Sequence, residues 1–409
     1  MTNPTAVVVG LRKNGLGVVR ALGRAGVPTL AVDDDLSTAY AATRYGSKVR
    51  CAAFDKEVFD EEAVVEALVR VGSELGHKAV LIPTMEKAIL PLSLHRARLE
   101  PYYAHSFPAH SVLERLVSKE GIHAYAQQMG FRVPATAHVH NSEMVEAVTR
   151  ELRAPYVLKP RVKTVEYGRN APRKAFLLHS AAELHTTYTM VAQWQPEVVI
   201  QEWIPGPERN IVFCLYYFDE ETRDLAWFSA RKIRQYRPYT GNATLAEPWH
   251  DIGLRDEGIR FFQGIHYRGF AGIEFKIDSR DGQKYLVEPT IGRTDRLVSL
   301  AAANGVNIPY VGYRHMAGLP ALPWQLSTRP VKYFLWNRDF QSARYYWRKG
   351  ELTLMDWLLS LRGRKQHALF AGDDLGPFLY DVSQPLHRRV RRSQQLLRAL
   401  TRRVARLFQ

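Results

Sequence analysis

Two glutamates, Glu274 and Glu288, are spaced so that they could share a metal ion. Residues 272–278 and 284–287 follow the pattern of two strands, and Arg280-Asp281-Gly282 between them supplies turn residues. The pattern predicts a β-hairpin that carries the two carboxylates on adjacent strands. Two hard anionic ligands of this kind suit Mg²⁺, which completes its octahedron with water and phosphate oxygens.

Arg293 follows Glu288 by five residues. A fixed guanidinium there could neutralise a phosphoryl group in transfer or a developing oxyanion. Acids and arginines on a hairpin are, however, more often a solvated face with weak surface ion pairs. Residue types alone therefore leave a phosphoryl-transfer site and a polar surface as alternatives.

The run Glu274-Phe-Lys-Ile-Asp-Ser-Arg-Asp-Gly, followed by Leu286-Val-Glu-Pro and Arg293, resembles the closing motif of the ATP-grasp superfamily. Within that superfamily it is most similar to carboxylate–amine ligases of the D-aspartate ligase type. The resemblance implies that Glu274 and Glu288 hold Mg²⁺ between nucleotide phosphates, with Mn²⁺ as an alternative ion. Thr290 stands where the family usually has an Asn as third metal ligand, and it offers only a hydroxyl.

Two lysines are candidates for contact with the nucleotide phosphates. Ser118 and Gly130 delimit a predicted helix over residues 119–129, and a lysine at its start opposes the helix dipole unless an anion lies nearby. The resemblance implies that Lys119 contacts phosphate, together with Lys159 at the end of a predicted strand. The segment 161–174 is cationic and poor in glycine, so it either replaces backbone phosphate contacts or forms a solvated flap.

The segment 197–208 reads as a strand that ends in a Pro-Gly turn. In the similar ligases, this linker binds adenine and the acid after the turn binds ribose. The resemblance therefore assigns adenine contacts to Gln201, Glu202, Trp203 and Ile204, and the ribose contact to Glu208.

The resemblance also implies an activity. The expected reaction is phosphorylation of a small-molecule carboxylate by ATP, attack of an amine on the acyl phosphate, and release of ADP and phosphate. Arg293 would stabilise the oxyanion, and Lys232 and Arg234 are candidates near the γ-phosphate and the acceptor. Catalysis would consist mostly of positioning and electrostatics.

These residues need a large α/β scaffold to position them. The chain has 409 residues, of which 46% are apolar and 24% charged, enough for two or three domain-sized cores. We expect a Rossmann-like domain over residues 1–110 and a two-lobed ATP-grasp domain over residues 111–320, with its lid lobe at about 150–203. An aromatic and basic extension, 321–409, would end in a helix.

The first domain opens with a βαβ pattern. Residues 6–10 and 28–35 read as strands around a helical pattern, with glycines spaced G-x4-G-x-G between the first strand and the helix. This spacing differs from the dinucleotide fingerprint G-x-G-x-x-G, so a structural role is favoured. Glu86 after a third strand is either a contact in the substrate cleft or an ordinary acid at a helix start.

Charge and cysteine usage bear on the compartment of the protein and on its contact with membranes. Two cysteines without metal-site spacing fit a reducing compartment, and no signal-peptide or membrane-span pattern is present, so a cytoplasmic protein is expected. The net charge is +15, and residues 387–409 hold eight arginines and no acid. That tail has an amphipathic helical pattern, which suits either peripheral contact with an anionic membrane or packing on the protein itself.

Two rival functions stay open at this point. The threonine at position 290 and the glycine-poor loop are compatible with an ATP-binding protein that has lost catalysis. The net charge of +15 is compatible with nucleic-acid binding, but no recognisable nucleic-acid module interleaves basic and aromatic residues, so no nucleic acid is expected as a partner.

Overall fold

The computed structural model describes residues 3–54, 59–161, 165–171 and 175–383 of the chain. The apolar run at residues 6–9 forms β1 (Ala6–Val9), which is fully buried at the centre of a parallel sheet. The order of this five-stranded sheet is β3-β2-β1-β4-β5. Its other strands are β2 (Thr29–Asp33), β3 (Ser47–Arg50), β4 (Ala79–Pro83) and β5 (Tyr103–Ala104).

Helices cover both faces of this sheet. On one face α1 (Lys13–Arg24) packs through Val18, Val19 and Leu22, and on the other α2 (Glu61–Leu75) packs through Val64, Val65 and Leu68. The short helices α3 (Ile89–Leu94) and α4 (Arg96–Leu99) follow β4. Parallel strands with helices on both faces confirm the predicted Rossmann-like start of the chain.

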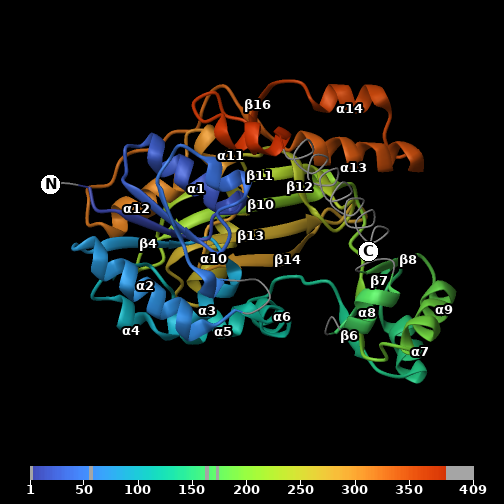
Figure 1. Ribbon diagram of the computed structural model, residues 1–409. Coiled ribbons are helices and arrows are strands. Elements are labelled where there is room, and N and C mark those ends of the chain that lie inside the picture. The colour runs from blue at the N-terminus through green and yellow to red at the C-terminus, as the bar shows by residue number, and fades with distance from the viewer. Residues whose placement is uncertain (1–2, 55–58, 162–164, 172–174, 384–409) are drawn as a thin grey trace, which may run out of the picture.

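A seven-stranded sheet forms the centre of the molecule (Figure 1). Its order is β14-β13-β10-β11-β12-β15-β16, and all neighbours are antiparallel except β15 and β16. The strands are β10 (Ile211–Phe218), β11 (Asp224–Tyr236), β12 (Asn242–Pro248), β13 (Gly269–Ile277), β14 (Lys284–Ile291), β15 (Val331–Phe334) and β16 (Arg364–His367).

Both faces of this large sheet are buried. Alternate residues of β10 contribute to opposite cores, with Phe213 and Leu215 on one side and Val212 and Tyr216 on the other. The first core is shared with α1, α11 (Val298–Ala303) and α12 (Ile308–Met316). The second is shared with α5 (His110–Val117), α6 (Lys119–Gln128) and α10 (Ile252–Gln263). The first core therefore joins the Rossmann-like sheet to the large sheet.

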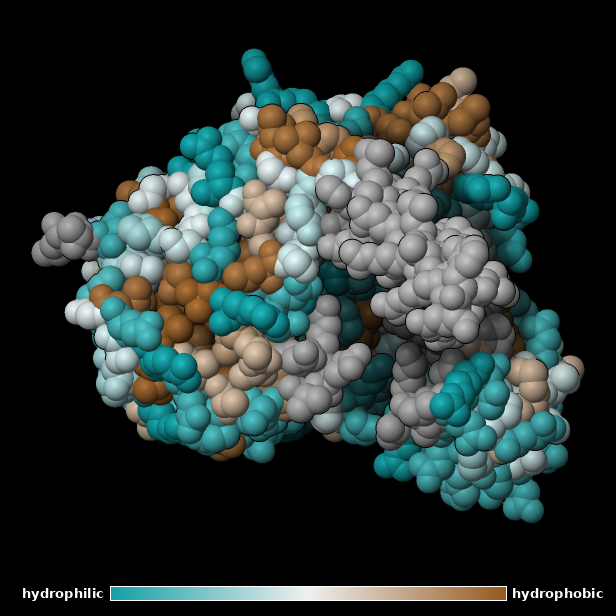
Figure 2. Space-filling model, in the orientation of Figure 1, coloured by the Kyte–Doolittle hydropathy of each residue, from teal (hydrophilic) through white to brown (hydrophobic). Residues whose placement is uncertain are grey.

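A separate small lobe has its own sheet and core. Its antiparallel order is β6-β9-β7-β8, and its strands are β6 (Thr136–Val139), β7 (Tyr156–Pro160), β8 (Phe176–Leu178) and β9 (Val198–Glu202). The helices of the lobe are α7 (Ser142–Glu151), α8 (Val165–Asn170) and α9 (Ala181–Ala192). Figure 2 shows a hollow between this lobe and the body, inside which mostly hydrophilic residues are visible.

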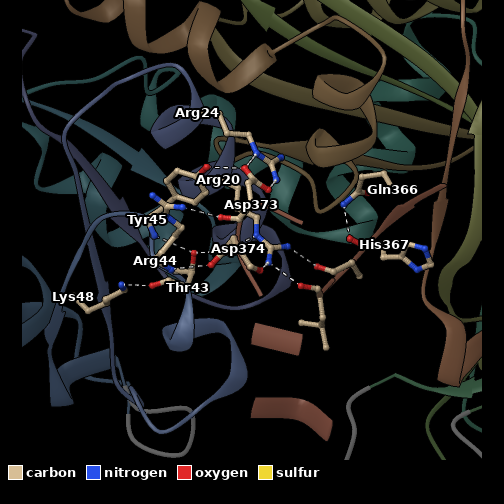
Figure 3. A network of polar contacts seen from close by, with 12 residues as sticks. Arg20, Arg24, Thr43, Arg44, Tyr45, Lys48, Gln366, His367, Asp373 and Asp374 are labelled. Atoms are coloured by element: carbon tan, nitrogen blue, oxygen red, sulfur yellow. Dashed lines mark hydrogen bonds and ion pairs between the residues drawn. The ribbon is translucent and has the colours of Figure 1, made fainter. Parts of the chain in front are cut away.

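The segment after residue 320 is built into the body. Besides β15 and β16 it supplies α13 (Trp336–Lys349) and α14 (Leu354–Ser360). Its pair Asp373 and Asp374 then returns to α1 (Figure 3). Asp374 Oδ2 accepts from Arg20 Nε at 2.8 Å in a buried ion pair, while Asp373 binds Arg24 at 2.7 Å near solvent. These contacts tie the last described segment to the first helix of the chain.

None of the helices in the described ranges combines the length and apolar character needed to cross a bilayer. The predicted amphipathic helix of the basic tail lies outside the described residues, as does part of the cationic segment 161–174.

Candidate active site

The hairpin predicted from sequence is present, and it places the two acids opposite each other. Glu274 on β13 pairs with Glu288 on β14, whereas the next residue, Phe275, pairs with Leu286. Val287 is therefore an extra residue in β14, a β-bulge of the kind that re-aims side chains beside active sites. The turn is held by Asp278, and Gly282 supplies its positive φ of 70°.

A lysine from a strand two positions away in the large sheet is bound to the first acid. Lys232 on β11 places its Nζ atom 2.7 Å from Oε2 of Glu274 and 2.9 Å from Oε1. Both side chains are largely buried, so this ion pair is little weakened by solvent. The predicted catalytic lysine and the predicted metal ligand thus meet in one cluster.

Glu288 is different, because it makes no ion pair with a described residue. Its side chain is accessible to solvent from the two cavities that it lines. The protein atoms packed around the carboxylate still partly desolvate it, which raises the pKa of Glu288, and the negative charge of Glu274 raises it further. A bound cation would therefore strongly stabilise the charged form of this carboxylate.

Two adjoining cavities meet at Glu288. The first, of about 520 Å³, is lined by the predicted residues Lys232, Glu274, Glu288, Thr290 and Arg293. The second, of about 480 Å³, is lined by the predicted residues Lys119, Lys159, Gln201, Glu288, Thr290 and Arg293. Nine of the fourteen candidate residues named from sequence, Glu86 included, therefore line these two cavities, and Glu86, Glu288, Thr290 and Arg293 line both.

The phosphate-binding candidates both line the second cavity, Lys119 from the body and Lys159 from the small lobe. Lys119 begins α6, whose N-terminus is capped by Ser118 accepting from Gly121 N at 2.9 Å. Lys159 is the second-last residue of β7 and donates to Gln201 Oε1 at 3.2 Å. Burial lowers the pKa of Lys159 to about 8, and the charge of Lys119 adds to the shift. An anion between the two lysines would relieve their repulsion.

Arg293 joins the two cavities to the Rossmann-like sheet. Its Nη2 atom lies 3.3 Å from Glu86 Oε2, and Nη1 donates to the Thr294 carbonyl at 3.1 Å. Glu86 lines both cavities and is also the first residue of a short 3-10 helix, Glu86–Ala88, so both of its predicted positions are observed. Glu86 is exposed, so solvent weakens this ion pair and leaves Arg293 able to bind a second anion.

Five predicted residues line neither cavity within the described part of the chain: Arg234, Glu202, Trp203, Ile204 and Glu208. Glu208 is surrounded by protein donors, namely Gln235 N at 2.7 Å, Tyr239 N at 3.0 Å and the hydroxyl of Tyr346. Burial raises the pKa of Glu208. The expected ribose contact of Glu208 is therefore not supported by its surroundings.

The guanidinium of Arg234 is likewise occupied by contacts inside the protein. It forms two hydrogen bonds to Asp339 of α13, at 2.9 and 3.0 Å, and a third to Ser360 at 2.9 Å. Both charged side chains are buried. This arrangement does not support the predicted catalytic role and fits a structural ion pair between the large sheet and the C-terminal helices.

The structure also adds residues that sequence reasoning missed. Arg12, Lys13, Tyr40, Asn242 and Arg296 line the first cavity. Arg12 and Lys13 lie in the glycine-containing segment for which a structural role was favoured, and from Lys13 onward that segment belongs to α1. Arg296 follows Arg293 by three residues. For Arg12, Lys13 and Arg296, the available signals were a basic side chain and a position close to the glycines or to Arg293.

Comparison with known proteins finds similarity in sequence and in fold. No family model matches the chain. A D-aspartate ligase of Enterococcus faecium (strain Aus0004) is 27% identical over 286 residues, which are 66% of this chain and 66% of the relative. The match thus spans about two thirds of that protein's length.

Solved structures share the fold at lower identity. An N5-carboxyaminoimidazole ribonucleotide synthetase, solved in its ADP complex, superposes with a TM-score of 0.61 at 15% identity, covering 81% of each chain. Biotin carboxylase from Campylobacter jejuni gives 0.60 at 14% identity, covering 80% of this chain and 74% of that one. The chain has the ATP-grasp fold, and both the predicted fold class and the resemblance to D-aspartate ligase are confirmed.

Proposed function

We propose that this chain, which has the ATP-grasp fold and is similar in sequence to a D-aspartate ligase, is an ATP-dependent carboxylate–amine ligase. The observation that carries the proposal is the position of Glu288. It faces Glu274 across the hairpin and stands where a cavity with two lysines meets a cavity with Lys232 and Arg293. Such a junction suits transfer of a phosphoryl group from a nucleotide on one side to a carboxylate on the other.

The side chains at the junction fit a divalent metal ion. Glu274 and Glu288 offer hard carboxylate oxygens and Thr290 offers a hydroxyl, the ligands that Mg²⁺ takes alongside nucleotide phosphates. Among the described residues no group of three or more His, Cys, Asp or Glu side chains forms a site of its own, so the ion would need phosphate or water ligands. Mg²⁺ would spread the negative charge of the phosphates when bound, and Mn²⁺ has similar ligand preferences.

The protein's own cations would position the reactants. Lys119 and Lys159 would hold the nucleotide phosphates in the second cavity. Lys232, fixed by Glu274 at 2.7 Å, would approach the transferred phosphoryl group from the first. Arg293 lines both cavities and would bind the substrate carboxylate and then the tetrahedral oxyanion.

The proposed reaction has two steps. A carboxylate oxygen attacks the γ-phosphorus of ATP, the bond to the β-phosphate oxygen breaks, and ADP and an acyl phosphate form. A neutral amine then attacks the acyl carbon, the C–O bond to phosphate breaks, and one proton leaves the nitrogen as the amide forms. No side-chain nucleophile is required, so the rate would come from positioning and electrostatics.

The test is an ADP-release screen over amino acids, other small carboxylates and amines, with mass detection of the amide. We expect ADP release only when a suitable carboxylate and amine are both present. Nucleotide binding without ADP release from any pair would favour the impaired ATP-binding protein instead. One observation favours this second candidate: Glu208, the expected ribose contact, is already hydrogen-bonded to protein groups.

The predicted contact of the basic tail with an anionic membrane stays a prediction, because residues 384–409 lie outside the described part of the chain. Co-sedimentation with vesicles that contain anionic lipid tests it. The full-length protein should bind and a chain ending at Gln384 should not. Equal binding by both would remove the tail from consideration as a membrane contact.

A further inference from the structure

Two of the cations that line the first cavity have no acidic partner among the described residues. The other three are paired: Arg12 with Asp34 at 2.9 Å, Lys232 with Glu274 at 2.7 Å, and Arg293 with Glu86 at 3.3 Å. Lys13 and Arg296 make no ion pair with a described residue, and both line this cavity. Their charges are also close enough to affect each other.

The backbone holds these two cations together. Lys13 is the first residue of α1, and the next residue, Asn14, donates to the Thr294 carbonyl at 2.5 Å and accepts from the Thr294 hydroxyl at 2.9 Å. The same Asn14 amide donates to the Thr84 carbonyl at 3.1 Å. Asn14 is buried, so these bonds fasten the start of α1 to the segment that carries Arg293 and Arg296.

The local electrostatics favour an anion at this place. Burial lowers the pKa of Lys13 to about 8, and the positive charges of Arg296 and Arg338 lower it further. Asp381 is the acid that acts in the opposite direction. The unpaired N–H groups in the first turn of α1 also favour negative charge near Lys13. A bound anion would supply the partner that the protein does not.

We infer that Lys13 and Arg296 form a subsite for a second anionic group, a carboxylate or a phosphate, on the small substrate whose reacting carboxylate binds at Arg293. The inference rests on the proposed ligase function for the identification of this molecule as a substrate. Lys119 and Lys159, the candidates for the nucleotide phosphates, line the second cavity, and Lys13 and Arg296 line only the first. The subsite therefore lies on the substrate side of Glu288.

This position restricts the substrate class. The first cavity, of about 520 Å³, also contains Lys232 and the two hairpin acids, so the substrate part must be small. It carries one carboxylate to be activated and one further anionic group to be held by Lys13 and Arg296. Dicarboxylates and phosphorylated carboxylates have this chemistry, and simple monocarboxylates lack it. Tight recognition by two charged donors would leave monocarboxylates as poor substrates.

Direct binding tests the subsite without any need for turnover. Calorimetry with succinate and phosphoglycolate as probes, against propionate and glycolate, separates molecules with two anionic groups from those with one. Comparing succinate with phosphoglycolate then distinguishes a carboxylate subsite from a phosphate subsite. We expect the wild-type protein to bind at least one two-anion probe about tenfold or more tightly than its single-anion counterpart.

Matched variants assign that preference to the two cations. Lys13→Gln and Arg296→Gln should each remove most of the tenfold preference and leave ATP affinity unchanged. Lys78→Gln and Arg150→Gln, which remove one exposed positive charge each, should keep it. The inference is overturned if the wild-type protein shows no preference for two anionic groups, or if the variants keep that preference. If the preference is confirmed but no carboxylate and amine pair releases ADP, the subsite stands and the ligase function fails.

Discussion

Glu274 and Glu288 are cross-strand partners in the β13–β14 hairpin, and Lys232 binds only the first of them, at 2.7 Å. This asymmetry distinguishes two acids that look equivalent in the sequence. Glu274 already has a cation, whereas Glu288 has none among the described residues and has a raised pKa. Glu288 is therefore the acid whose charge would depend most on a bound metal ion.

Replacing Glu288 by Gln should abolish most activity without unfolding the protein. The amide keeps the size of the side chain but loses the charge that would bind Mg²⁺, so turnover should fall by about 100-fold or more. Steady-state ADP release measures the loss, and thermal unfolding verifies the fold. Glu146→Gln, on the exposed face of α7, is the matched control. Turnover like that of the wild type at saturating Mg²⁺ would refute this role of Glu288.

Nucleotide binding should take up a proton near pH 8. The pKa of Lys159 is lowered to about 8 by burial and by Lys119, and phosphates bound beside it would raise that pKa again. A pKa that is higher in the complex than in the free protein means that the affinity for ATP falls as the pH rises through about 8. Calorimetry in buffers of different ionisation enthalpy measures the uptake.

The same measurement on Lys159→Gln provides the control for that prediction. The variant should bind ATP more weakly and show little proton uptake near pH 8, because the titrating group is gone. Uptake of the same size in the variant would show that Lys159 does not contact the phosphates.

Asp374 and Asp373 should differ strongly in their effect on stability. Asp374 is in a buried ion pair with Arg20, and removing one partner leaves an unpaired buried charge, so Asp374→Ala should cost about 3–5 kcal/mol. Asp373 pairs with Arg24 where both side chains are more than 40% exposed, so Asp373→Ala should cost about 1 kcal/mol or less. Thermal unfolding of the two variants measures the difference.

The pH dependence of that difference has a defined sign. Burial alone would raise the pKa of Asp374, but hydrogen bonds from Thr43 and the Arg44 amide, together with Arg20, lower it below its ordinary value. The stability from Asp374 should therefore be complete above about pH 5 and be lost as the pH falls through the lowered pKa. Equal destabilisation by the two variants at neutral pH would contradict the conclusion that Asp374, and not Asp373, forms the stabilising buried ion pair.

Glu208 should prove to be structural. In Glu208→Gln the new amide group would face backbone and side-chain donors, and we expect a loss of about 1–3 kcal/mol in stability. ATP affinity should change less than about threefold, because Glu208 lines neither described cavity. Unfolding midpoints and ATP calorimetry test the two parts. Unchanged stability together with tenfold weaker ATP binding would instead support the ribose contact that the sequence resemblance implies for Glu208.

Local patterns were sufficient for the parts of the site that are close in sequence. The alternation and turn residues of the hairpin predicted that Glu274 and Glu288 would be neighbours, and the cap at Ser118 predicted the start of α6. The strand expected to carry Lys159 is also present, as β7, although the phosphate role of Lys159 came from the family resemblance. In each case the decisive interactions lie within a few residues or within one hairpin.

The rest depended on contacts between distant segments. Arg234 meets Asp339, 105 residues away, and Glu208 meets Tyr346, 138 residues away, so their partners could not be inferred from local spacing. The position of Lys13 depends on the bond from Asn14 to Thr294, 280 residues away. The antiparallel pairing of β12 with β15 is also non-local, and it builds the segment after residue 320 into the large sheet.

The most direct test of the central claim follows oxygen atoms through the reaction. With a carboxylate that supports ADP release, labelled with ¹⁸O in its carboxyl group, and with its amine partner, we predict that one labelled oxygen appears in the released phosphate. This transfer follows because the carboxylate oxygen attacks phosphorus and later leaves with it. Phosphate without label, or AMP and pyrophosphate in place of ADP and phosphate, would contradict the acyl-phosphate ligase that we propose.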